Sequence, residues 1–307
     1  MVQGRSLGDG GELEDLLMRL EVSLAPMRGQ ARELDGGITN RNFRVTFGDV
    51  DYVVRRPGKD TELLGIDRSA ERLANEAAAA LGIAPAVALA LEDCLVTRFV
   101  NCTSVGAGEL AADVEQLARE LRAFHDSGVV LPTRFDVGEL LEDYAAVVRA
   151  RRRTVPSEYD EAVLVAAHIR DALPPVDLRP CHNDLLAGNV IRASDDGRLM
   201  IVDWEYAGMG DPRFDLGNLS VNNEFDEATD ARLLHAYHGE PPSAAQAAAL
   251  KLMRLLSDAR EGAWGMVQAE VSELDFDFAG YAREHFQRLL ATAARPQFDE
   301  WLVSAGA

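Results

Sequence analysis

The chain has 307 residues, more than one hydrophobic core usually holds, so we expect one large domain or two modest ones. Hydrophobic residues make up 47% and charged residues 27% of the chain, which is ordinary for a globular protein and excludes a disordered one. The net charge of −20 disfavours nucleic acid as a partner, because proteins that bind it usually present a basic face.

The cysteines and the apolar runs indicate the cellular compartment of the protein. Cys94, Cys102 and Cys181 are an odd number without the two-residue spacing of metal sites, so we expect reduced thiols. The longest uncharged run, Ala77–Leu91, is interrupted by glycine and proline and is too short to cross a bilayer. The first residues contain no apolar stretch of the kind that directs secretion. We therefore expect a cytoplasmic protein.

The first hundred residues predict one packing helix and then a strand-rich segment. Leucines recur at helical spacing over residues 12–24. Strands are predicted at 43–47 and 52–56 around a Gly48-Asp49 turn, and at 86–91 and 94–100 around a turn at 92–93. A helix is predicted over residues 67–81. The composition shift at 103–108 indicates a linker.

The rest of the chain predicts mainly helices. They are expected at residues 110–126, 137–153, 158–172, 230–237, 244–271 and 279–293. His125, near the end of the first of these, is expected to be a core or capping histidine and not a ligand, given the usual intermediate burial of histidine.

Between these helices, the stretch from Arg179 to Leu219 collects polar residues at the ends of two apolar runs. The runs, residues 189–191 and 199–202, flank a Ser-Asp-Asp-Gly turn and predict a hairpin. Pairing the runs would bring Asp184, Asn189 and Asp203 to one end of the hairpin. Carboxylate and amide oxygens are hard ligands, suited to Mg²⁺ that also holds water and phosphate.

The order of these residues matches a kinase. A carboxylate is followed after five residues by an amide and after fourteen more by a second carboxylate, as in the kinase series of catalytic Asp, metal-binding Asn and metal-binding Asp. For any one of these residues taken alone, a capped turn before a strand remains an equally good interpretation.

The motifs around these residues resemble the choline/ethanolamine kinase family, a branch of the small-molecule kinases that includes the aminoglycoside phosphotransferases. They are Cys-His-Asn-Asp-Leu at 181–185, Asn189, Val-Asp-Trp-Glu-Tyr-Ala-Gly at 202–208 and Asp-Pro-Arg-Phe-Asp-Leu-Gly-Asn at 211–218. The resemblance covers roughly residues 30–290. It implies an α+β, bilobal protein-kinase-like fold, with a β-rich nucleotide-binding lobe at 1–102 and a mainly helical catalytic and acceptor-binding lobe at 103–307.

The resemblance also implies roles for individual residues. Asp184 would be the catalytic base, Asn189 and Asp203 would hold Mg²⁺, and ATP would be the donor. Asp215 would be structural and would tie down the catalytic loop through hydrogen bonds.

A nucleotide site is implied in the first lobe. Its phosphate contacts are expected in Gly-Gly-Ile-Thr-Asn-Arg-Asn-Phe at 36–43, although a glycine pair between strands is more often only a hairpin turn. Arg55 aligns best with the family's phosphate-binding cation, and Glu71 is preferred to Glu76 as its helical partner, with exposed helix carboxylates as the alternative for both. The segment Leu95–Val100 resembles the hinge that holds adenine. The expected nucleotide-binding residues are Gly37, Thr39, Asn40, Asn42, Arg55, Glu71, Thr97 and Phe99.

An acceptor site is expected beside Asp184. An ammonium group is best held by aromatic faces together with a carboxylate. Glu205 follows directly after the metal-binding segment, and several aromatic residues lie further along the chain. The expected acceptor-binding residues are Glu205, Tyr206, Trp264, Phe276, Phe278 and Tyr281. Aromatic residues at helical spacing are more often core, and this alternative stays open.

The predicted function is ATP-dependent phosphorylation of the hydroxyl group of choline or ethanolamine by a monomer or homodimer. The alternatives are an aminoglycoside or other antibiotic kinase, which could present Asp275 and Asp277 to a polycation, and a thiamine kinase-like enzyme. A non-catalytic nucleotide-binding protein is least favoured, because the Asp-Asn-Asp set is intact. We expect a small amino-alcohol as substrate, with neither nucleic acid nor a membrane as partner.

Overall fold

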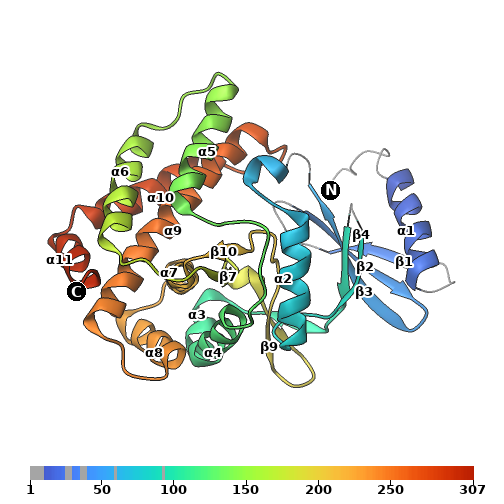
Figure 1. The fold of residues 1–307 in the computed structure, drawn as a ribbon. Helices are drawn as coiled ribbons and strands as arrows, with labels where there is room; N and C mark the ends of the chain where they lie inside the picture. The colour runs from blue at the N-terminus through green and yellow to red at the C-terminus, as the bar shows by residue number, and fades with distance from the viewer. Residues whose placement is uncertain (1–9, 25–29, 35–39, 59–60, 92–93) are drawn as a thin grey trace. The chain divides into compact units, whose positions relative to one another are not determined.

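The computed structural model describes residues 10–24, 30–34, 40–58, 61–91 and 94–307 (Figure 1). By its internal contacts the chain divides into two compact units. Unit 1 comprises Met1–Lys59 and Pro85–Val100, and unit 2 comprises Asp60–Ala84 and Asn101–Ala307.

Unit 1 contains an antiparallel five-stranded sheet in the order β1-β2-β3-β5-β4. Its elements are α1 (Gly10–Leu24), β1 (Gln30–Glu33), β2 (Asn40–Phe47), β3 (Val50–Pro57), β4 (Val87–Leu91) and β5 (Cys94–Arg98). Alternate residues of β2, namely Phe43, Val45 and Phe47, are buried in one cluster with Leu16 and Leu20 of α1. The apolar alternation and the leucine spacing therefore give this unit its core.

Unit 2 is mainly helical. Its helices are α2 (Arg68–Ala80), α3 (Ala107–Leu110), α4 (Val114–His125), α5 (Val137–Ala150), α6 (Ser157–Ala172), α7 (Pro212–Asn222), α8 (Glu227–His238), α9 (Ala244–Val271), α10 (Phe278–Ala293) and α11 (Pro296–Ala305), with 3₁₀ turns η1 (Thr61–Leu64), η2 (Ala111–Asp113) and η3 (Ala187–Asn189). Short strands complete it: β6 (Cys102–Ser104), β7 (Arg179–Cys181), β8 (Val190–Ala193), β9 (Leu199–Ile201) and β10 (Gly208–Gly210).

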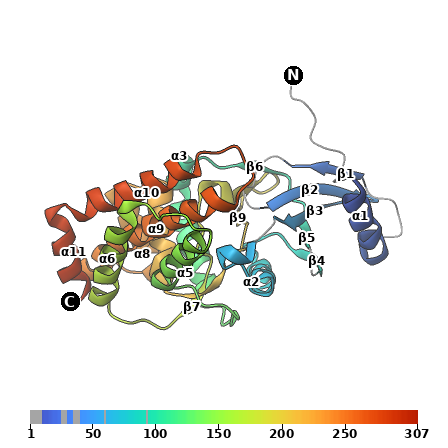
Figure 2. The same ribbon diagram turned by 90° about the horizontal axis from the view of Figure 1, so that it is seen from above.

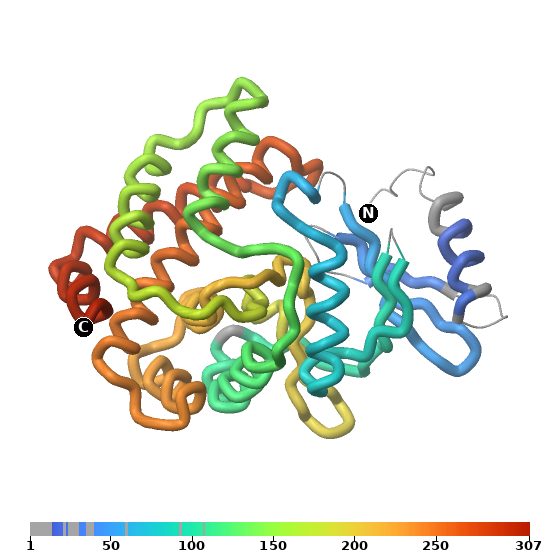
Figure 3. The backbone as a smooth tube through the Cα atoms, in the orientation of Figure 1, coloured from blue at the N-terminus to red at the C-terminus, as the bar shows by residue number. Residues whose placement is uncertain are grey.

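Helix α9 is the long central element of unit 2. The chain turns back after α8 and then runs through 28 residues without a break (Figure 3). Helices α5, α6, α7, α10 and α11 all pack against it, as the two ribbon views show for α6, α10 and α11 (Figures 1 and 2). Ser243 begins α9 with a capping box formed with Gln246. Because α9 is covered on most sides, nearly all of its residues from Ala248 to Gln268 are buried.

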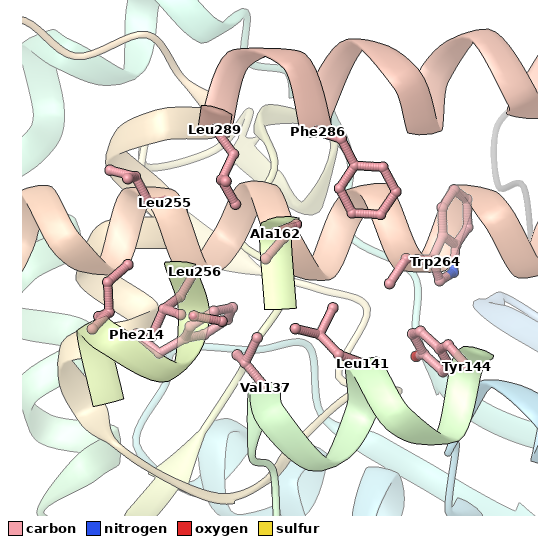
Figure 4. Close-up of a cluster of buried hydrophobic side chains, with 14 of the residues drawn as sticks. Val137, Leu141, Tyr144, Ala162, Phe214, Leu255, Leu256, Trp264, Phe286 and Leu289 are labelled. Atoms are coloured by element: carbon pink, nitrogen blue, oxygen red, sulfur yellow. The ribbon is translucent and has the colours of Figure 1, made fainter. Parts of the chain in front are cut away.

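Side chains from six helices, α5, α6, α7, α9, α10 and α11, meet in the large core of unit 2, part of which is drawn in Figure 4. Leu141 and Tyr144 from α5 and Trp264 from α9 belong to it. Two glycines let α10 come close to α9. A Cβ at Gly262 would lie 2.7 Å from the ring of Phe286, and one at Gly265 would lie 2.9 Å from the ring of Tyr281. Glycine at these positions therefore sets the spacing between two helices that carry predicted acceptor-binding residues.

The predicted hairpin is present. Strands β8 and β9 pair antiparallel, with Val190 opposite Ile201, and β6 pairs with the other edge of β8. Strands β7 and β10 form a separate two-stranded sheet. The segment that contains Asp184 follows β7, and Asp203 lies between β9 and β10.

Some elements differ from the sequence-based expectation. Residues Cys102–Ser104 form β6, so the predicted linker at 103–108 is wrong over its first residues, and α3 begins within it. The predicted helix at 110–126 is divided into the end of α3, η2 and α4. Helices α7 and α11 and strands β1, β7 and β10 were not predicted. The predicted turn at 92–93 lies outside the described residues. The predicted division of the chain at residue 102 remains a prediction.

No helix among the described residues is long and apolar enough to span a membrane.

Candidate active site

The loop after β7 is held by a buried carboxylate on α7. The backbone N–H groups of His182 and Asn183 donate to Asp215 over 2.8 and 2.7 Å, and His125 Nε2 donates over 2.9 Å. Burial raises the pKa of Asp215, but the hydrogen bonds from His125 and from the backbone N–H of His182 outweigh it and hold the pKa below its usual value. The predicted structural role of Asp215 is confirmed, and so is the assignment of His125 as a core histidine, because its other nitrogen contacts Tyr237.

The same loop fixes the tautomer of His182. The backbone N–H of Asp184 can only donate, so Nδ1 of His182 accepts this bond, at 3.2 Å. Nε2 then carries the proton and donates to the carbonyl of Val202 over 3.0 Å. This neutral histidine joins the Asp184 segment to the end of the hairpin. Asn183, with φ of 67°, adds a bond from Nδ2 to the carbonyl of Tyr206 at 3.0 Å.

The hairpin brings the predicted catalytic residues together. Nδ2 of Asn189 donates to the backbone carbonyl of Asp184 at 2.8 Å and to its Oδ2 at 3.1 Å. The N–H of Val202 donates to the carbonyl of Asn189, which places Asp203 one residue beyond this pairing. Asp203 has a φ of 66°, a left-handed conformation that is uncommon for residues other than glycine and that clusters at functional sites.

Asp184 also contacts a residue that the sequence did not single out. Nη1 of Arg260, on α9, donates to Oδ1 of Asp184 over 3.1 Å and to Oε1 of Glu261 over 2.7 Å. Burial raises the pKa of Asp184 well above its usual value; Arg260 counters this effect, whereas Glu261, Asp203 and Glu205 reinforce it. The site therefore concentrates negative charge, which favours a bound cation.

The oxygen atoms present fit Mg²⁺. Because both bonds from Asn189 to Asp184 use Nδ2, its Oδ1 is left over as a possible ligand. With the carboxylate of Asp203, it forms a pair of hard oxygen donors, the ligand type that Mg²⁺ prefers.

The predicted acceptor-binding aromatic residues form one connected cluster. The ring of Trp264 lies 5.8 Å from those of Phe278 and Tyr281, and Phe276 lies 4.8 Å from Phe278. Nε1 of Trp264 donates to the hydroxyl of Tyr206 at 2.8 Å. Figure 4 shows Trp264 on α9 at the edge of the large core. Phe276, with 50% of its surface exposed, is the accessible member.

The predicted carboxylates lie in different surroundings. Glu205 is buried, and its Oε2 lies 3.4 Å from Nη1 of Arg68 on α2. Asp277 is the N-cap of α10 and accepts the N–H of Gly280. This capping role explains Asp277 without a ligand. Asp275 is exposed.

The predicted nucleotide-binding residues of unit 1 lie on its central strands. Asn42 on β2 is opposite Arg55 on β3, and Val53 is opposite Thr97 on β5. Asn40 and Arg55 are buried. The N–H of Phe99, just after β5, donates to the carbonyl of Asp51. Gly37 and Thr39 lie outside the described residues.

Glu71 and Glu76 differ in burial. Glu71 is 3% exposed and lies 2.7 Å from Nη1 of Arg68, whereas Glu76 is exposed and pairs with Arg72 on the helix surface. A buried carboxylate is the better candidate for a specific role, so the preference for Glu71 gains support. Its pairing with Arg55 remains a prediction.

A β-sheet unit, a mainly helical unit and the neighbouring Asp184, Asn189 and Asp203 are the features expected of a phosphotransferase of kinase-like fold. The sequence model of the phosphotransferase enzyme family matches residues 30–250. The crystal structure of a choline/ethanolamine kinase family protein from Mesorhizobium loti is 30% identical, with a TM-score of 0.81 over 96% of this chain and 98% of that one. The chain belongs to the phosphotransferase enzyme family and, within it, to the choline/ethanolamine kinase family.

Two further comparisons agree. The chain is 28% identical to protein LicA of Haemophilus influenzae over 66% of its own length and 61% of that protein. A structure of LicA in complex with AMP is 25% identical, with a TM-score of 0.76 over 93% of this chain and 99% of that one. The predicted family, the α+β kinase-like fold and the enzyme class are thus confirmed.

Proposed function

We propose that this protein transfers the γ-phosphate of ATP to the hydroxyl group of choline or ethanolamine. The observation that carries the proposal is the contact set of Asp184, whose carboxylate is bound by Asn189 on one oxygen and by Arg260 on the other, in a buried acidic site that also holds Glu205. The family name of the similar Mesorhizobium loti protein, choline/ethanolamine kinase, supports the same acceptors.

Asp184 acts at the acceptor hydroxyl. Its carboxylate accepts the hydroxyl proton as the oxygen bonds to the γ-phosphorus and the bond from phosphorus to the bridging oxygen of ADP breaks. Oδ1 of Asn189 and the carboxylate of Asp203 would hold Mg²⁺. When bound, this ion neutralises phosphate charge.

Arg55 is the cation for the nucleotide phosphates in this proposal, and its pairing with Glu71 stays a prediction from the sequence. Asn40 and Asn42 supply polar contacts, together with Gly37 and Thr39 outside the described residues. The backbone of the Thr97–Phe99 segment binds adenine. The AMP complex of LicA supports an adenine nucleotide as the donor.

The acceptor ammonium is held by carboxylate charge and aromatic rings. Glu205 supplies a buried charge, and Trp264, Phe276 and Phe278 supply aromatic faces. Ethanolamine can also donate N–H bonds to a carboxylate, whereas choline cannot.

The test is ADP release by the full chain with ATP, Mg²⁺ and a panel of acceptors: choline, ethanolamine, thiamine and several aminoglycosides. The proposal expects turnover with choline or ethanolamine at the highest kcat/KM. Highest turnover with an aminoglycoside, abolished by Asp275→Asn with Asp277→Asn, would replace it with an antibiotic kinase. The capping role of Asp277 makes thermal melting of that double variant a necessary control.

A cytoplasmic location and a monomeric or homodimeric state remain predictions.

A further inference from the structure

Arg260 is a buried arginine in the middle of α9. It is 2% exposed, and its Nη1 lies between two carboxylates, Oδ1 of Asp184 at 3.1 Å and Oε1 of Glu261 at 2.7 Å. The carbon of its guanidinium group lies 4.3 Å from the ring centre of Tyr206. Burying a charge is costly unless it is paired and hydrogen-bonded. Arg260 is therefore kept in place by specific partners, of which one is the proposed catalytic base.

The partners of Arg260 are themselves fixed by side chains from two helices. Oε2 of Glu261 accepts the hydroxyl hydrogen of Tyr281 on α10, over 2.9 Å. The hydroxyl of Tyr206 accepts the indole N–H of Trp264. The close approach of Tyr281 to α9 is possible because residue 265 is glycine. A continuous series of contacts thus leads from α10 through Glu261 and Arg260 to Asp184.

Two donor nitrogens of Arg260 support a role beyond packing. Nε and Nη2 are buried and have no hydrogen-bond partner among the described residues. Leaving a buried donor unpaired costs about 1–3 kcal/mol, so a residue kept only for stability would be expected to satisfy them. Within the part of the chain that the structure describes, the guanidinium group is oriented by the bonds of Nη1 to Asp184 and Glu261 and by the contact with the ring of Tyr206.

The contact with Arg260 fixes the orientation of the Asp184 carboxylate. One carboxylate oxygen accepts from Arg260 and the other from Asn189, so donors on two different elements hold the plane of the base. A base is effective only when its oxygen stays within hydrogen-bond reach of the proton that it removes.

We propose that Arg260 is a positioning residue that holds the Asp184 carboxylate toward the acceptor hydroxyl, and that Glu261, Tyr281 and Tyr206 act on the reaction through Arg260. This inference rests on the proposed function. It changes the predicted role of Tyr206 and Tyr281, because one face of Tyr206 is taken by Arg260 and the hydroxyl of Tyr281 is used by Glu261. Changes at these two tyrosines should therefore lower kcat more than they raise KM for the acceptor.

The test compares the steady-state constants of Arg260→Lys and Tyr281→Phe in the full chain, with the best acceptor of the panel. Lysine keeps the charge but loses the planar group that stacks on Tyr206. We expect Arg260→Lys to lower kcat by about tenfold or more, and Tyr281→Phe by about threefold, with both KM values within about threefold of the wild type. The double variant should be no slower than Arg260→Lys alone, because both changes act through one contact.

Arg288→Lys is the matched control. Arg288 on α10 pairs with Asp258 on α9, so it also links these helices by an ion pair, but it has no contact with Asp184. Its kcat should stay at the wild-type value. Tyr281→Phe removes a single hydroxyl group and keeps the inference testable if Arg260→Lys does not fold.

A second readout is chemical rescue. Millimolar guanidinium chloride should raise the kcat of Arg260→Ala and leave Asp184→Asn unchanged, because only the former lacks a guanidinium group.

The outcomes separate the two claims. If the wild type is active and kcat is unchanged in Arg260→Lys and Tyr281→Phe, the inference about Arg260 is overturned and the proposed function stands. An effect confined to KM for the acceptor, or an equal loss in Arg288→Lys, would overturn the inference as well. No turnover of any acceptor by the wild type would overturn the proposed function and the inference with it.

Discussion

Asp215→Asn exchanges one oxygen of a buried carboxylate for an NH₂ group. In the wild type, one oxygen accepts from the N–H of Asn183 and the other from the N–H of His182 and from Nε2 of His125. An asparagine has one acceptor oxygen, so at least one buried N–H would face a donor in place of an acceptor. The hydrogen bonds that remain would be made to a neutral amide oxygen in place of a charged carboxylate.

The magnitude follows from these bonds. A hydrogen bond to a charged group contributes about 1.5–3 kcal/mol, and an unpaired buried donor costs about 1–3 kcal/mol. We therefore expect Asp215→Asn to lower the free energy of unfolding by about 2–4 kcal/mol. The value of kcat should also fall, because the bonds to His182 and Asn183 fix the backbone that precedes Asp184.

Urea unfolding followed by tryptophan fluorescence measures the change. The 3 tryptophans, Trp204, Trp264 and Trp301, all lie in unit 2, so the signal reports the unit that contains Asp215. Asp211→Asn is the control on the same helix. Asp211 is an N-cap, a position that asparagine fills equally well, so its effect should stay below about 1 kcal/mol. If Asp215→Asn were as mild as Asp211→Asn, the loop would not depend on this carboxylate and the reasoning would be refuted.

Two further predictions concern the substrates. Arg55→Ala should raise KM for ATP by about tenfold, the loss expected for one ionic hydrogen bond, and leave KM for the acceptor unchanged. Arg56→Ala, on the opposite face of β3, should change neither KM value. An increase in KM for the acceptor alone would contradict the assignment of Arg55. Trp264→Leu should weaken choline by about tenfold, equivalent to 1.4 kcal/mol, while Trp264→Phe, which keeps a ring, should lose less. If KM for choline rises equally in the two Trp264 variants, ring electrostatics do not hold the acceptor.

Local patterns in the sequence were sufficient for much of this fold. The hairpin at β8 and β9 and the bounds of α9 followed from apolar periodicity and turn residues, which depend on neighbours in the chain. Helix α7 lacked such a signal, because it is buried on nearly every side and so has no polar face to set a period. Strand β1, Gln-Ala-Arg-Glu, is a short charged edge strand without apolar alternation.

In the candidate site, too, residues close together in the sequence were predicted and a distant one was not. Asp184, Asn189 and Asp203 lie within one short stretch, so their spacing could be compared with a known motif. Arg260 lies 76 residues from Asp184 in the chain, and no local spacing connects them. A signal was present but faint, since a charged Arg-Glu pair within a long apolar helix requires buried partners. Identifying those partners required the packing of α9 against the Asp184 loop.

The most direct test of the account compares Asp184→Asn with the wild type, using ATP, Mg²⁺ and choline or ethanolamine, and follows the phosphorylated acceptor by mass spectrometry. The exposed Asp195→Asn, in the turn of the same hairpin, is the matched control. The account predicts that Asp184→Asn lowers kcat by about 10²–10⁴-fold, the contribution of a general base, while Asp195→Asn keeps the wild-type rate. Turnover by Asp184→Asn close to that of the wild type would contradict the assignment of Asp184 as the catalytic base.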